Sequence, residues 1–200
     1  MLNSQRVKTL QNGFYQGQSV LYWMSRDKRV KDNWALIEAQ KFAIEKKVPL
    51  IVCFQYFGKF KEANIRQYSF LLKGLLELSN DLKLLNINFY LTQGTAKHSI
   101  LKIINDNSVG ALFVDYNPIK SYKRKIFNVV NRINIPVYQV DAHNIIPVWV
   151  TSQKKEFAAY TIRKKIHNNL DTFLTEFPEI KWHPYGSITS LNVTYQEIID

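Results

Sequence analysis

The chain has 200 residues, of which 46% are hydrophobic and 14% aromatic, and this composition favours one folded domain with a sizeable core. Its apolar runs fall short of the ~18 residues of a membrane span, and we expect no secretory signal. The formal net charge of +11 favours association with polyanions such as nucleic acid, although many lysine-rich proteins bind nothing acidic. A single cysteine, Cys53, excludes an internal disulfide and favours a cytoplasmic location, in the nucleoid or nucleus when DNA is bound.

The first predicted strand covers residues 19–24, after an amino-terminal extension of residues 1–18. Its nearly continuous apolar run is typical of a strand that is covered on both faces, as in a parallel sheet. A charged loop follows, and Asp32 or Asn33 can cap the next helix. Ligands of open parallel sheets bind at the carboxyl ends of strands, so this loop is either part of a binding site or a solvated connection.

Strands and helices then alternate as far as Val140. Five strands separated by helices predict an α/β domain, residues 19–178, with an open five-stranded parallel sheet and helices on both faces. The later strands are expected at 49–56, 86–91, 110–115 and 136–140, and the later helices at 65–82, 94–105 and 120–132.

The pattern changes beyond Val140. Residues 144–150 contain Pro147 and are expected to be an extended connection or an edge segment. A long helix, capped by Ser152, is predicted over 154–177. One side of that helix carries Arg163, Lys164 and Lys165, which either face solvent or face a second domain or DNA. Residues 179–200 are interpreted as the start of an interdomain linker.

Several familiar site chemistries are missing from the sequence. Its glycines form no phosphate-binding motif, and its four histidines have no metal-ligand spacing, so no metal site is predicted. No basic run is interleaved with aromatic residues in the manner of a single-strand binding platform. Asp115 ends the fourth strand, where a carboxylate can cap a neighbouring helix or bind a ligand. His143 is interpreted as a hydrogen-bonded turn residue rather than a base.

Three long segments, in the same order, resemble one protein family. Residues 22–36 read Tyr-Trp-Met-Ser-Arg-Asp-Lys-Arg-Val-Lys-Asp-Asn-Trp-Ala-Leu, and the others are residues 63–75 and 141–167. They are similar to the amino-terminal α/β domain of class II cyclobutane pyrimidine dimer photolyases. The resemblance implies the strand order 3-2-1-4-5.

This resemblance also implies an activity, because photolyases use light and reduced FAD to donate an electron that splits the pyrimidine dimer. The protein positions that cofactor, and the dimer is flipped out of the duplex to meet it. In the family, the flavin and the lesion pocket belong to a carboxy-terminal helical domain, which we expect to be absent here. The chain alone is therefore expected to be inactive, with no catalytic residue, and monomeric. The alternative is a stand-alone or vestigial module that binds a chromophore or nucleotide.

The family's α/β domain packs on its FAD domain and, in many members, holds an antenna chromophore, either 8-hydroxy-5-deazaflavin or a folate. Arg26 is expected to pair with a ligand anion and Asp115 to accept from a ring N–H, unless the two pair with each other or with the backbone. An apolar surface for the FAD domain is expected around residues 144–177, and DNA contacts of the parent protein at Arg163, Lys164 and Lys165. The candidate antenna residues are Met24, Ser25, Arg26, Phe54, Gln55, Asp115 and Tyr116.

Overall fold

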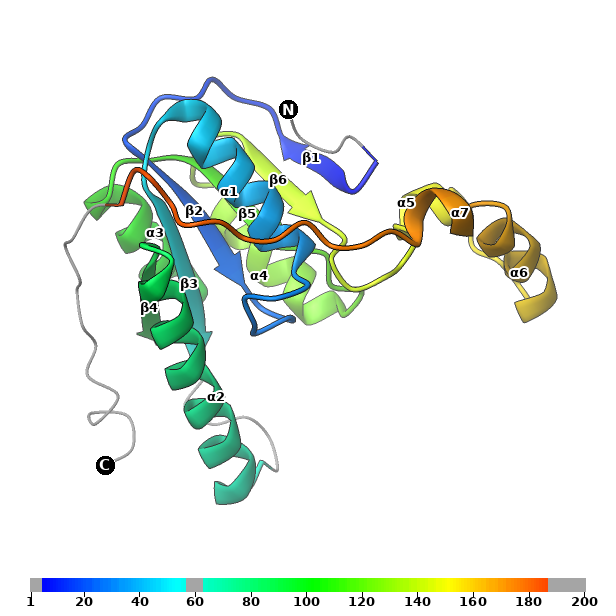
Figure 1. Cartoon of the computed structure of the whole chain (residues 1–200), viewed down its shortest axis with the longest axis horizontal. Helices are drawn as coiled ribbons and strands as arrows, with labels where there is room; N and C mark the ends of the chain where they lie inside the picture. Colours follow the sequence, from blue (N-terminus) through cyan, green and yellow to red (C-terminus); the bar gives the residue numbers. More distant parts are fainter. Residues whose placement is uncertain (1–4, 57–62, 187–200) are drawn as a thin grey trace.

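A computed structural model describes residues 5–56 and 63–186, which form a six-stranded sheet with helices on both faces (Figure 1). The strand order is β1-β6-β5-β2-β3-β4. The last five of these strands are parallel, in the relative order 3-2-1-4-5 that the family resemblance implies. The strands are β1 (Val7–Gln11), β2 (Ser19–Met24), β3 (Leu50–Tyr56), β4 (Asn88–Gln93), β5 (Val109–Asp115) and β6 (Val137–Val140).

The sixth strand corrects the prediction of a five-stranded, purely parallel sheet. β1 pairs antiparallel with β6, with Val7 opposite Val140, and so covers what would be a free edge of the sheet. The residues of β1 are all exposed or half-buried, and no apolar run marks them. Their strand conformation comes from the pairing with β6, which sequence periodicity does not record.

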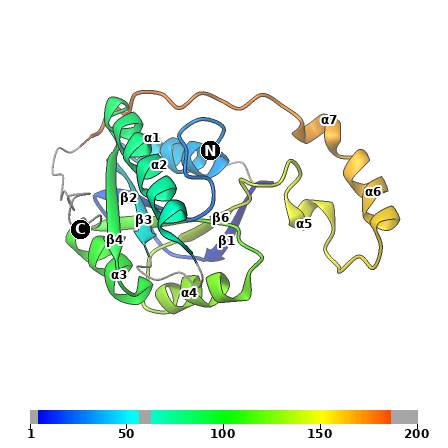
Figure 2. The ribbon, with the colours of Figure 1, turned by 90° about the horizontal axis from the view of Figure 1, so that it is seen from below.

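Helices α1 (Trp34–Lys46) and α2 (Ile65–Leu84) cover one face of the sheet, and α3 (Ala96–Asp106) and α4 (Lys120–Val130) cover the other (Figure 2). Side chains alternate along β2, so that Val20, Tyr22 and Met24 join one core, while Leu21 and Trp23 join the second. The two-sided burial explains why the strand sequence is apolar without alternation.

The start of α1 fixes the loop that follows β2. Asn33 is the capping residue, and its side-chain oxygen accepts hydrogen bonds from Ala35 N at 3.0 Å and Leu36 N at 3.1 Å. Asp32, the other candidate, instead has a φ of 53° and turns the chain into the cap. The charged loop is therefore held at both ends, by β2 and by the capped helix.

The region after β6 differs from its prediction. It forms three short helices, α5 (Val148–Thr151), α6 (Ala159–His167) and α7 (Leu170–Phe173), so the single helix expected over 154–177 is wrong, as is a fully extended 144–150. Ser152 is extended, and its hydroxyl donates to Glu156 rather than opening a helix. Together α5 to α7 form an arm that projects from the sheet (Figure 1).

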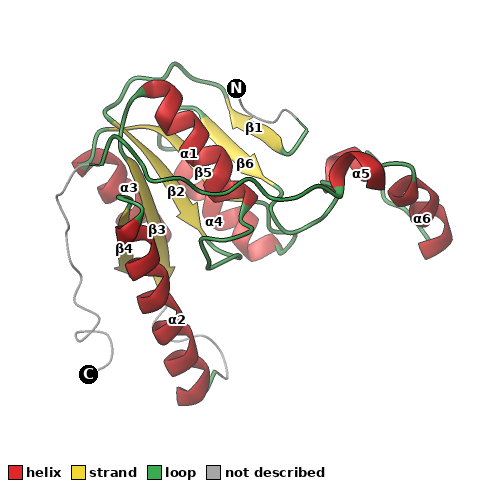
Figure 3. Ribbon diagram, viewed as in Figure 1, coloured by secondary structure: helices red, strands yellow, loops and turns green. Residues whose placement is uncertain are grey.

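The chain then returns as an irregular strap, residues 174–186, that crosses α1 (Figure 3). Gln40 Nε2 donates to Lys181 O at 2.6 Å, and Asn86 Nδ2 donates to His183 O at 2.7 Å. The ring of Phe177 lies 4.9 Å from that of Trp34. Within the described residues, the segment expected to be a linker is thus fastened to the domain. The rest of the expected linker, residues 187–200, lies outside the described residues.

Candidate functional site

A small cavity lies at the carboxyl ends of β2, β3 and β5, where ligands of parallel sheets bind. Its volume is about 40 Å³, enough for a few water molecules but not for a chromophore with three fused rings. Its walls are mainly apolar and aromatic, with a few polar groups. The lining residues are Trp23, Met24, Ser25, Phe54, Gln55, Val114, Asp115, Tyr122, Lys125 and Ile126.

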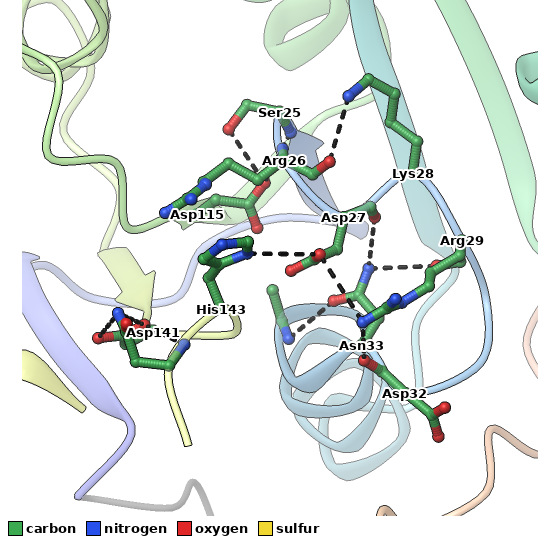
Figure 4. A network of polar contacts seen from close by, with 12 residues as sticks. Ser25, Arg26, Asp27, Lys28, Arg29, Asp32, Asn33, Asp115, Asp141 and His143 are labelled. Atoms are coloured by element: carbon green, nitrogen blue, oxygen red, sulfur yellow. Dashed lines mark hydrogen bonds and ion pairs between the residues drawn. The ribbon is translucent and has the colours of Figure 1, made fainter. Parts of the chain in front are cut away.

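Asp115 is the centre of a buried hydrogen-bond network beside this cavity (Figure 4). Its Oδ2 accepts from Ser25 N at 2.7 Å, Ser25 Oγ at 3.0 Å and Arg26 N at 2.8 Å, and its Oδ1 accepts from Tyr22 OH at 2.7 Å. Burial raises the pKa of Asp115, while these four donors oppose the rise. Of the two readings of Asp115, the geometry favours a carboxylate that caps the loop after β2 over one that is open to a ligand.

Asn33 connects this network to the charged loop (Figure 4). Its side-chain nitrogen donates to Asp27 O at 2.9 Å and to Arg29 O at 3.2 Å, while its oxygen caps α1. Asp27 in turn lies 3.7 Å from His143 Nδ1. His143 therefore sits at a turn and contacts a carboxylate, and Asp27 Oδ2 is buried without a hydrogen-bond partner in the described residues.

Gln55 provides the unpaired polar atom of the cavity wall. The residue is 2% exposed, and its Nε2 donates to Gly94 O at 2.8 Å. Its Oε1 is buried and has no partner among the described residues, so it can accept a hydrogen bond from a bound molecule.

The outer wall of the cavity comes from α4. Lys125 Nζ lies 5.0 Å from the centre of the Tyr122 ring, and burial lowers the pKa of Lys125. Both side chains are half-buried and reach over the carboxyl ends of the strands. Rotation of these two side chains is the simplest way to enlarge the cavity.

A sequence model described as DNA photolyase matches residues 20–181, which is most of the chain. The chain belongs to the DNA photolyase family. It is 42% identical over 190 residues to a deoxyribodipyrimidine photo-lyase of Potorous tridactylus, and 37% identical over 207 residues to one of Arabidopsis thaliana. These alignments cover 92% and 98% of this chain. The expected resemblance to the amino-terminal α/β domain of class II photolyases is confirmed.

Solved structures of photolyase-family proteins share the fold. A cryptochrome of Synechocystis matches with a TM-score of 0.69 over 88% of this chain, at 16% identity. A class III photolyase of Agrobacterium tumefaciens matches with the same TM-score over 91% of the chain. The photolyase-family chain spans only 36% and 41% of the lengths of the Potorous and Arabidopsis relatives.

The fold brings five of the seven candidate antenna residues of this photolyase-family domain to the cavity. Met24, Ser25, Phe54, Gln55 and Asp115 all line it. Arg26 lies beside it and contributes its backbone N–H to Asp115. Tyr116 points to a different groove, where its ring lies 5.7 Å from that of Trp149.

Sequence reasoning missed Tyr122 and Lys125, because only loop and strand ends were considered. The signal was present in the amphipathic pattern of α4, whose buried Ile126 faces the sheet and carries its neighbours to the cavity.

The three basic candidates for DNA contact have different environments. Lys165 forms an ion pair with Glu156 and donates to Ser152 Oγ at 3.0 Å, so it is engaged within the arm. Arg163 and Lys164 are exposed. Among the described helices, none is a candidate for a membrane span. The described residues also contain no group of three histidine, cysteine or acidic side chains placed to hold a metal.

Proposed function

We propose that this chain is the amino-terminal α/β domain of a light-driven DNA repair photolyase, which splits cyclobutane pyrimidine dimers by electron transfer from reduced FAD. The observation that carries the proposal is the similarity, over nearly the whole chain, to relatives named deoxyribodipyrimidine photo-lyase. The chain matches little more than a third of those relatives, so we assign the FAD and lesion sites to the part that it does not span.

A surface for that second part is supplied by the arm. Helices α5 and α6 contain no buried residue, and short helices of this kind need packing to be stable. Exposed apolar side chains of this size, gathered on one segment, mark a partner surface. On the arm and its borders, the exposed fractions are 53% for Ile145, 80% for Phe157, 69% for Tyr160 and 66% for Leu174.

A chimera tests the repair function. The matching part of the Potorous relative is replaced by this chain, joined after residue 181, and repair of a dimer-containing oligonucleotide is measured in light and in darkness. We expect light-dependent repair by the chimera and none by the 200-residue chain with added FAD. Repair by the chain alone would refute the proposal. So would a folded, FAD-loaded chimera that does not repair.

We also propose that the cavity binds an antenna chromophore, a deazaflavin or a folate, which absorbs light for the flavin. The apolar walls suit a planar ring, and Gln55 Oε1 suits a ring N–H. The present volume requires Tyr122 and Lys125 to turn outward first. Asp115 acts as a positioning residue, because it holds the backbone of Ser25 and Arg26 at the cavity rim.

Titration of 8-hydroxy-5-deazaflavin and of a folate, followed by the absorption spectrum of the complex, tests the antenna site. Tyr122→Ala should tighten binding by opening the wall, and Gln55→Leu should weaken it by removing the acceptor. Tyr160→Ala, on the exposed arm, is the matched control and should change nothing. Unchanged affinity in both cavity variants would remove the antenna from this cavity.

A stand-alone ligand-binding module is the second candidate function, because every described residue that lines the cavity belongs to this chain. Tight chromophore binding by the chain together with an inactive chimera would favour this candidate.

A further inference from the structure

A second concave surface lies between β1, α4 and α5, shares only Ile126 with the lining of the cavity, and is named here the basic-aromatic groove. Its charged and aromatic members are Lys8, Tyr116, Lys123, Phe127, Trp149 and Lys155. They come from four separate parts of the chain. The fold therefore brings together lysine and aromatic side chains that are not neighbours in the sequence.

The charge of the groove has one sign. Lys8, Lys123 and Lys155 are its charged members, and none of the described residues that line it is acidic. Helix α4 reinforces this charge, since its sequence Lys-Ser-Tyr-Lys-Arg-Lys-Ile-Phe-Asn-Val-Val contains no acidic residue. All three groove lysines are exposed, so they are accessible to an anion. The surface is thus complementary to a polyanion.

The aromatic rings of the groove are partly held in place. Trp149 Nε1 donates to Gln5 O at 2.8 Å, and its ring meets that of Tyr116 edge to face, with the ring planes at 85°. Lys123 Nζ lies 5.9 Å from the centre of the Tyr116 ring. Phe127 is 48% exposed and has no such fixed partner among the described rings. The groove therefore combines exposed ring surface with its three lysines.

We propose that the basic-aromatic groove binds single-stranded nucleic acid, with phosphates at the lysines and bases stacked on Phe127 and Trp149. Cations that follow a backbone, interleaved with aromatic rings, are the arrangement by which proteins bind unpaired strands. The carboxylates of an acidic peptide would use the lysines but not the rings, whereas a nucleic-acid strand uses both, and a membrane surface needs protruding rather than concave apolar residues. The argument for this site rests on neither the repair function nor the antenna, although the groove shares Ile126 with the cavity and includes Trp149 and Lys155 of the arm.

Fluorescence anisotropy of a labelled 12-nucleotide oligothymidine with the 200-residue chain tests the charges. The triple variant Lys8→Ala, Lys123→Ala, Lys155→Ala should weaken binding at least about tenfold, and the slope of log K against log salt should fall by about 2. The matched control is Lys73→Ala, Lys97→Ala, Lys102→Ala, which removes the same charge from exposed positions of α2 and α3. Equal losses in the two triple variants would overturn the proposal, because binding would then follow net charge alone.

The stacking contact is tested with Phe127→Ala, and with Phe70→Ala on α2 as its control, since Phe70 is 83% exposed outside the groove. Phe127→Ala should weaken oligothymidine binding about tenfold and leave heparin binding unchanged. Duplex DNA, whose bases are covered, should bind more weakly than the single strand and be insensitive to Phe127→Ala. Two results would refute the groove as a single-strand site and show a patch that binds any polyanion. One is oligothymidine binding that does not change in Phe127→Ala. The other is duplex DNA and heparin binding as tightly as oligothymidine.

Discussion

The guanidinium carbon of Arg6 lies 4.5 Å from the centre of the Trp34 ring, although 28 positions separate the two residues along the chain. The same guanidinium lies 5.5 Å from the ring of Phe173 and donates to the carbonyl oxygens of Asp141 and Asn144. One buried side chain therefore joins the segment before β1, the start of α1, the turn after β6 and the arm.

Replacing Arg6 by Met should destabilise the domain by about 3–5 kcal/mol, because it leaves buried carbonyl groups and nearby acidic charges without their cation. Urea unfolding, followed by tryptophan fluorescence, measures this change. Lys8→Met, an exposed position on β1, should change the stability by no more than about 0.5 kcal/mol. Similar effects of the two variants would show that Arg6 does not connect these elements.

Asp115→Asn should loosen the loop after β2 and destabilise the fold by about 3 kcal/mol, because the amide nitrogen would face the N–H groups that the carboxylate now accepts. Ser25→Ala removes one of the four donors and should cost only about 1 kcal/mol. Amide hydrogen exchange of residues 25–33 compares the two variants. If the amides of residues 25–33 in Asp115→Asn were as well protected from exchange as in the native chain, contacts other than those of Asp115 would hold the loop.

Acid should break the ion pair between Glu156 and Lys165 of α6. The hydrogen bond from Lys165 lowers the pKa of Glu156 from its ordinary 4.5 to about 2. Because the folded pKa is depressed, the stabilisation is complete above pH 4.5 and is lost as the pH falls from 4.5 toward 2. Carboxyl NMR should show Glu156 titrating near 2 in the native chain and at a higher pH in Lys165→Met, where the hydrogen bonds from Ser152 and Thr161 still hold its pKa below 4.5. Lys164→Met, at the exposed neighbouring position, should leave this titration where it is.

The strap should also respond to pH, through His183. This residue is fully buried, its Nε2 lies 2.9 Å from Val48 O, and its Nδ1 is buried without a partner in the described residues. Burial lowers the pKa of His183 below its ordinary 6.5, and the bond to Val48 opposes this. The unfolded state therefore takes up the proton first, and strap stability is complete above pH 6.5 and falls as the pH drops below it.

Hydrogen exchange of residues 174–186, corrected for the intrinsic effect of pH, measures this response. Protection should decrease between pH 7.5 and pH 5.5 in the native chain. His183→Gln keeps a donor for Val48 but does not titrate, so its protection should stay constant over this range. A strap that loses protection equally in both chains would exclude His183 as the cause.

The sequence predicted the central strands best, because β2, β3 and β5 are covered on both faces and their apolar runs record that burial directly. Asn33 was one of two predicted caps, with Asp32, because a capping side chain bonds to backbone groups two or three residues away. β4 begins at Asn88 rather than Asn86, since Asn86 has a φ of 59° and forms the turn before it.

The features that were missed depend on tertiary contacts. β1 becomes a strand only beside β6, about 130 residues later in the chain, and the helix expected from 154 begins only at Ala159, after a segment in which Ser152 and Glu156 bond to each other and to Lys165. For the cavity, strand ends predicted most of the lining, whereas the α4 side chains depended on how that helix lies on the sheet. Periodicity describes one element at a time and contains no information on such pairings.

The antiparallel strand β1 has a consequence for handling the protein. A chain shortened to begin at Ser19, the boundary suggested by the first apolar run, would lose both β1 and Arg6. The backbone N–H and C=O groups of β6 would then form an open edge, and such edges recruit strands from neighbouring molecules. With β1 present, the edge strand is instead short, irregular between Thr9 and Gln11, and carries the exposed Lys8, all of which disfavour such pairing, so any trimmed version should retain it.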